Sequence, residues 1–96
     1  MIRLIIRGVD QAATMAYAGD LVQHCKENLA GREDEVRILG PATAPIGKLR
    51  DRYRIHVLLI STDGELLRKA VSKVYEHARP VEGIQWVVDV DPLSML

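Results

Sequence analysis

The sequence has few of the residues that catalytic, metal and disulfide-bonded sites require. Its single cysteine, Cys25, excludes an internal disulfide and a cysteine-rich zinc site. The three histidines lie far apart, and none stands at metal-ligand spacing from another histidine or from the cysteine. There is also no Walker loop and no glycine-rich phosphate turn of recognised spacing. The sequence therefore predicts no catalytic residue, no metal site and no bound cofactor.

An excess of charge of one sign and a long apolar run are also absent. Thirteen basic residues balance thirteen acidic ones, so only the distribution of charge, and not the net charge, can indicate a nucleic-acid or membrane partner. The longest apolar runs are far too short to span a bilayer. The first residues predict a strand rather than a signal peptide, because Arg7 interrupts a short apolar run. We therefore expect no membrane partner, and the single cysteine is consistent with a reducing cytoplasm.

The residues that are present suffice for one packed core. The chain has 96 residues, of which 48% are hydrophobic. A chain of this size buries roughly two-thirds of its unfolded surface, which is enough for one core. We find no linker, no internal repeat and no low-complexity segment. The sequence therefore predicts a single domain that spans residues 1–96.

Hydrophobic periodicity predicts four strands and two helices in the order β-α-β-β-α-β. The strands are expected at 2–7, 35–39, 52–60 and 84–90, and the helices at 11–30 and from 63 to about 78. Asp10 is expected to cap the first helix, and Gly31 to end it. Thr62 and Glu65 have the spacing of a capping box for the second helix, and Arg79-Pro80 closes it. The segment 40–51 is expected to be a loop.

This order of elements predicts an α+β fold with a split β-α-β-β-α-β arrangement. Its simplest form is a four-stranded antiparallel sheet with two helices packed on one face. The first and third strands are then central. Trp86 alternates with Ile84 and Val88 and is expected in the core, as is Cys25 on the apolar stripe of the first helix. His24 is expected to be a solvated helix residue.

The exposed face of this sheet is expected to carry basic side chains. Arg3 and Arg7 share one face of the first strand, Arg54 and His56 share one face of the third, and Arg37 joins them from the second. Two interpretations remain open: the charges bind an anionic partner, or they keep a one-sided sheet soluble.

An RNA-recognition domain has the same strand order but needs aromatic residues on the central strands. The chain has no phenylalanine, and Ile5 and Arg54 occupy such positions, which argues against that class.

Two carboxylates near the end of the chain are a further candidate site. Asp89 and Asp91 lie two residues apart, so they can share one face of a strand. Such a pair can hold a metal or act in acid–base chemistry. The simpler interpretation, which we favour, is that Asp91-Pro92 ends the strand and the carboxylates cap it or pair with a neighbouring arginine.

The segment 40–60 changes character halfway along. Two prolines and two glycines precede a basic cluster, Lys48, Arg50, Arg52 and Arg54, which occupies alternating positions. An extended chain projects alternating residues to one side, while Asp51 points to the other. Four basic residues and one acidic residue give the segment 48–54 a net charge of +3. The pattern indicates an anion-binding stripe, and the alternative is a solvated loop edge.

Two stretches of this sequence resemble a known family. "LGPATAPIGKLRDRYRIHVLL" resembles the GPAPAPI-x-x-L-R-x-R-Y-R segment of primosomal protein N′, the bacterial replication-restart helicase, and "WVVDVDPLSML" resembles the V-D-V-D-P signature at that family's C-terminus. The resemblance covers nearly the whole chain. One departure is Thr43, where a small residue such as alanine is common in the family.

The resemblance implies that the chain is the C-terminal domain of such a helicase. The ATP-binding motifs and zinc-binding cysteines lie upstream in that family, so neither ATP nor zinc is expected here, and no ATP hydrolysis or DNA unwinding. The implied partners are forked or single-stranded DNA, the acidic tail of single-stranded-DNA-binding protein and the upstream helicase domains. The implied location is the bacterial cytoplasm, at replication forks on the nucleoid.

The family's R-x-R motif matches Arg52 and Arg54, which the resemblance assigns to the acidic tail or to the DNA backbone, and the polar position of His56 can join that site. Two other classes remain open. One is a regulatory split βαβ domain that binds a small anionic ligand at a dimer interface. The other is a structural domain that packs against the helicase core.

Overall fold

A computed structural model describes residues 1–49 and 52–90, the side chains of residues 44–49 excepted. The chain order is β-α-β-β-α-β, as predicted, with a short 3-10 turn before the second strand. The elements are β1 (Ile2–Gly8), α1 (Gln11–Asn28), the 3-10 turn (Glu33–Glu35), β2 (Arg37–Leu49), β3 (Arg52–Ile60), α2 (Gly64–His77) and β4 (Ile84–Val90).

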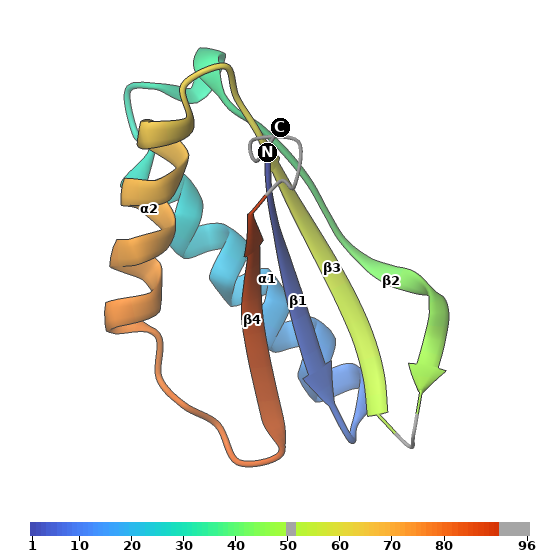
Figure 1. The fold of residues 1–96 in the computed structure, drawn as a ribbon. Coiled ribbons are helices and arrows are strands. Elements are labelled where there is room, and N and C mark those ends of the chain that lie inside the picture. The colour runs from blue at the N-terminus through green and yellow to red at the C-terminus, as the bar shows by residue number, and fades with distance from the viewer. Residues whose placement is uncertain (50–51, 91–96) are drawn as a thin grey trace.

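The four strands form one open antiparallel sheet in the order β2-β3-β1-β4. Both helices cover the same face of this sheet (Figure 1). The predicted α+β fold is therefore confirmed, and so is the central position of β1 and β3. Ile5 marks the middle of the sheet, because it lies opposite His56 on one side and Val87 on the other.

The core lies between the sheet and the two helices. It is built from the alternate residues of the central strands and from the apolar stripes of α1 and α2. The side chains with no more than 1% exposure include Leu4, Ile6, Leu21, Cys25, Ile55, Val57, Leu59 and Leu67. Trp86 packs against this core from β4, partly buried, with its ring edge-on to Tyr75 at a centroid distance of 5.2 Å. Its inward position is as predicted.

Helix α1 begins where the sequence predicts. The Asp10 carboxylate accepts a hydrogen bond from the amide of Ala12 at 3.1 Å. The buried hydroxyl of Thr14 donates to the Asp10 carbonyl at 2.6 Å. Gly8 allows this close contact, since a Cβ there would lie 1.9 Å from the Thr14 hydroxyl oxygen. The helix ends at Asn28, two residues earlier than predicted, and Gly31 has a positive φ of 87° beyond it.

Helix α2 is not capped as the sequence pattern suggested. The cap is Asp63, whose carboxylate accepts from the amide of Leu66 at 3.1 Å, and not Thr62. Ser61 explains the shift, because its hydroxyl accepts from the Asp63 amide at 3.1 Å and makes a turn before the helix starts. The helix therefore starts at Gly64 and ends at His77, just before Arg79-Pro80.

The expected loop at 40–51 is wrong for most of its length. Strand β2 continues from Arg37 to Leu49, with register irregularities between Leu39 and Ala42 and between Thr43 and Lys48. Two features permit this. β2 is an edge strand, where proline can lack its amide hydrogen on the outer side. Gly40, with a φ of 98°, precedes a cis bond to Pro41 and provides a backbone conformation that other residues rarely adopt.

Candidate nucleic-acid interface

One face of the sheet is left uncovered by the helices (Figure 1). We call it the open face and define it by the described strand residues whose side chains alternate away from the core. On β1 and β4 these are Arg3, Ile5, Arg7, Gln85, Val87 and Asp89. On β2 and β3 they include Arg37, Leu39, Arg52, Arg54, His56, Leu58 and Ile60.

The open face is basic although the chain as a whole is neutral. It bears five arginines against one aspartate, while the complete sequence has equal numbers of acidic and basic residues. The structure brings Arg3, Arg7 and Arg54 onto neighbouring central strands, and it places Arg37 on the same face opposite Ile60. An uneven distribution of this kind creates a local positive potential.

One of these arginines has a partner within the domain. Arg3 lies opposite Asp89 across β1 and β4, and its guanidinium donates to the Asp89 carboxylate at 2.6 Å. Both side chains are a little over 40% exposed, so the pair is a surface salt bridge of modest energy. The expectation that Asp89 pairs with a neighbouring arginine is thereby confirmed. Asp91, its predicted companion, lies outside the described residues.

Arg7 and Arg54 lie directly opposite each other on the two central strands. In the part of the chain that the structure describes, neither makes an ion pair with a carboxylate. The Nε atom of Arg54 is buried and has no hydrogen-bond partner. The open face therefore holds two facing cations that are not neutralised by described groups.

His56 completes this cluster in an uncharged form at neutral pH. It follows Arg54 by two positions on β3 and shares its face, opposite Ile5. Burial lowers the pKa of His56 below its usual value, and the cations of Arg3 and Arg54 lower it further. Its Nε2 atom is buried without a hydrogen-bond partner. The ring therefore resists protonation.

The basic cluster in the segment 48–54 does not form one extended stripe. Leu49 pairs with Arg52, so Lys48 belongs to β2 whereas Arg52 and Arg54 belong to β3, which runs back beside it. The prediction of a single extended chain is wrong because β2, which was predicted to end at residue 39, continues to Leu49 and pairs there with the start of β3. Arg50 lies outside the described residues, as does the side chain of Lys48.

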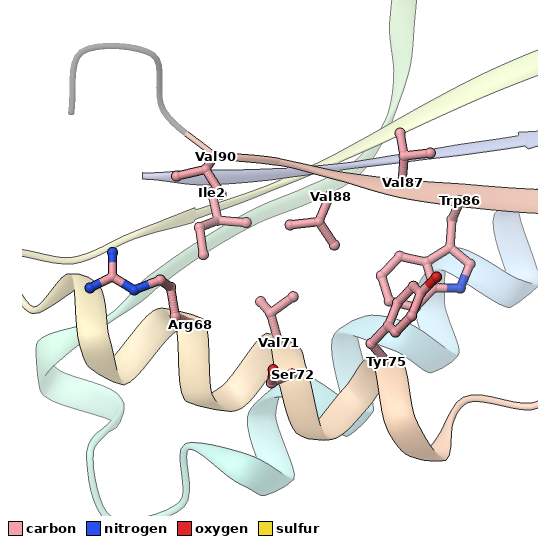
Figure 2. A pocket seen from close by; sticks show the side chains of 9 residues that line it. All are labelled: Ile2, Arg68, Val71, Ser72, Tyr75, Trp86, Val87, Val88 and Val90. Carbon is pink, nitrogen blue, oxygen red and sulfur yellow. The ribbon is translucent and has the colours of Figure 1, made fainter. Parts of the chain in front are cut away.

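An apolar groove, which sequence reasoning missed, lies between α2 and β4. Its volume is about 470 Å³. In Figure 2, Ile2, Val71 and Val88 point toward one another from β1, α2 and β4, with Arg68 at one end and the Tyr75–Trp86 ring pair at the other. The sequence feature that could have indicated this groove is the number of apolar residues on β4, an edge strand that α2 covers only in part.

Other chemistry-bearing side chains do not gather into a site. Among residues 1–49 and 52–90, no three histidine, cysteine or acidic side chains lie close enough to hold a metal. Cys25 is buried, and this burial raises the pKa of its thiol to about 11. His24 is exposed on α1, as predicted. No described helix combines the length and hydropathy needed to cross a membrane.

Comparison with known proteins identifies the family. Residues 1–93 match the family described as "Primosomal protein N C-terminal domain". The chain belongs to this family. The resemblance inferred from its two signature stretches is thus confirmed.

A curated relative shows how this domain relates to a longer protein. The chain is 26% identical over 96 residues to "Replication restart protein PriA" of Borreliella burgdorferi, with all of the chain and 14% of the relative aligned. The chain thus spans about one-seventh of the length of that relative. Among solved structures, the de novo designed protein Foldit4 has a TM-score of 0.63 at 12% identity, with 94% of each chain covered. This likeness concerns the fold alone.

Proposed function

We propose that this primosomal C-terminal domain is a non-catalytic module that binds DNA through the open face of its sheet. The observation that supports the proposal is the concentration of five arginines on one uncovered face of a neutral protein. Guanidinium groups bind phosphate oxygens strongly, through two parallel hydrogen bonds where the geometry allows. Contacts of this kind to phosphates position a protein on nucleic acid without reading its bases.

The β2–β3 hairpin extends this proposed interface at one end of the sheet. Arg52 begins β3 on the open face, and Arg50 and Lys48 precede it by two and four residues in the sequence. We include all three as proposed phosphate contacts. The Borreliella relative is named a replication restart protein, and the family resemblance implies forked or single-stranded DNA as a partner, so a fork with a single-stranded arm is the substrate to test. The proposed location is the bacterial cytoplasm, at such forks.

A salt titration of the 96-residue chain tests the proposal. Labelled forked and single-stranded DNA are titrated at two salt concentrations, with fluorescence anisotropy as the readout. Three or four phosphate contacts give a log–log slope of affinity against salt of about −2 to −4. Absence of binding at low salt would refute direct DNA contact. It would favour the alternative that the domain has a structural role and packs against upstream helicase domains. Binding of a small anion by a stable dimer would favour the regulatory class.

We also propose that the groove between α2 and β4 binds the acidic tail of single-stranded-DNA-binding protein. The favouring observation is its combination of an apolar lining with the cation of Arg68 at one end (Figure 2). An acidic peptide with an apolar end requires both features. Arg52 and Arg54, which the family motif suggests for this role, provide charge at another part of the molecule.

Charge variants can assign the tail to one of these places. An acidic peptide with an apolar C-terminus is titrated into the chain and into Arg68→Gln, with Lys69→Gln on the same helix as the matched control. Selective loss in Arg68→Gln supports the groove, and selective loss in Arg52→Gln/Arg54→Gln places the tail at β3. Equal, small effects in all three would mean that general charge attracts the peptide. Because upstream domains can complete the pocket, we expect weak binding by the isolated chain.

A further inference from the structure

The arginines of the open face differ in whether a described carboxylate balances their charge. Arg3 has a carboxylate partner at 2.6 Å, so its charge is balanced within the domain. Arg7 has Gln85 opposite it on β4 and Arg54 opposite it on β3. Like charges that face each other across neighbouring strands destabilise a sheet. On the same face, the charge of Arg3 is thus balanced by Asp89, whereas Arg7 and Arg54 face each other without a described carboxylate.

A second unfavourable feature coincides with this pair. The Nε–H of Arg54 is buried and unpaired in the described structure, and a buried donor without an acceptor is destabilising. His56, the next residue on that face of β3, contributes no acceptor that bonds to it, and its own Nε2 is buried and unpaired as well. The facing charges have one remedy, which is an anion with several acceptor oxygens that binds both guanidinium groups.

We propose that Arg7 and Arg54 form a clamp for one phosphate group and that Arg3 has a structural role. This inference rests on the proposed DNA-binding function and assigns its phosphate contact to one pair of residues. A phosphate is the fitting ligand because its oxygens accept from two planar guanidinium groups at once. The Gln85 side chain, which is exposed on β4 opposite Arg7, can donate a further hydrogen bond.

The clamp makes stability and binding change in opposite directions. Arg7→Gln/Arg54→Gln removes the facing charges, so at low salt we expect the Tm to rise by about 2–5 °C. The same variant loses one phosphate contact, so the log–log salt slope of DNA binding becomes shallower by about 1. Arg3→Gln is the matched control on the same strand and face. It leaves Asp89 without its partner, so we expect a lower Tm and an unchanged salt slope.

Inorganic phosphate separates the clamp from the DNA-binding proposal. We expect millimolar phosphate to raise the Tm of the wild type and of Arg3→Gln, and to have little effect on the double variant beyond that of equal ionic strength from chloride. Equal protection of all three proteins would overturn the clamp, as would wild-type DNA binding by the double variant. If phosphate protection requires the pair but neither the wild type nor any variant binds DNA, the clamp stands as a site for a free phosphate group and the DNA-binding proposal falls.

Discussion

Gly40 offers a sharp test of the structure because one added methyl group meets two separate penalties there. Its φ of 98° lies in a region that residues with a Cβ rarely adopt. A Cβ at this position would also lie 2.6 Å from the carbonyl oxygen of His56 on β3. Both penalties arise where β2 is irregular, next to the strand that carries Arg54. Gly40→Ala is therefore expected to destabilise the fold and to disturb the open face.

The magnitude follows from these two penalties. The backbone conformation costs about 1–2 kcal/mol for an L-residue, and the forced shift of β2 against β3 costs about 1–2 kcal/mol more. Gly40→Ala should thus lower the free energy of unfolding by about 2–4 kcal/mol, a large part of the 5–15 kcal/mol typical of a domain. For a chain of this size the urea midpoint then falls by roughly 1.5–3 M.

Gly19→Ala is the matched control for this measurement. Gly19 lies within helix α1, and no atom lies within 4 Å of the position its Cβ would occupy. Alanine is the better helix former, so this variant should gain about 0.5–1 kcal/mol. Urea unfolding followed by circular dichroism measures both variants. A stability of Gly40→Ala within about 0.5 kcal/mol of the wild type would refute the backbone conformation and the close approach of β2 to β3.

Three other predictions concern the α2 cap, the open-face histidine and the cysteine. Asp63→Ala should cost about 1 kcal/mol in urea unfolding because it removes the cap of α2, whereas Thr62→Ala should be close to neutral; the reverse order would restore the capping box read from the sequence. Because the pKa of His56 is lowered in the fold, its contribution to stability is present above the unfolded value of 6.5 and is lost as the pH falls through the lower folded value. His56→Gln should therefore lose less stability than the wild type between pH 7.5 and pH 5 in thermal unfolding, and equal losses would contradict the shift. Burial raises the pKa of the Cys25 thiol to about 11, so this thiol should react with a thiol reagent at pH 8 only upon unfolding in urea. Rapid labelling of the native protein would show that the thiol is accessible to solvent.

The fold was largely predictable because its central elements have strong periodic patterns. β1, β3 and β4 alternate apolar and polar residues, and Asp10 stands directly before the first helical residue. β2 was not predictable beyond its first residues, since prolines and glycines normally indicate a loop. Here its place at the sheet edge and the positive φ of Gly40 allow a strand to continue through them.

The sequence predicted which arginines share the open face, but it did not predict how they are arranged on it. Alternation alone places Arg3, Arg7 and Arg54 on one face. It does not state which residues face each other, because strand register depends on pairing between segments far apart in the sequence. The facing of Arg7 and Arg54, and the pairing of Arg3 with Asp89, therefore came from the structure. The groove beside Arg68 required the position of α2 relative to β4, which no local pattern encodes.

The most direct test of DNA binding by the open face follows the side-chain Nε–H signals of the arginines by NMR while forked DNA is added. We expect shifts or broadening for Arg7 and Arg54, and smaller changes for Arg3, whose guanidinium is held by Asp89. Arg68 on α2 and Arg79 beyond its end serve as internal controls on the helical side of the sheet, and they should stay unchanged. Shifts confined to Arg68 and Arg79, with Arg7 and Arg54 unaffected, would contradict the account.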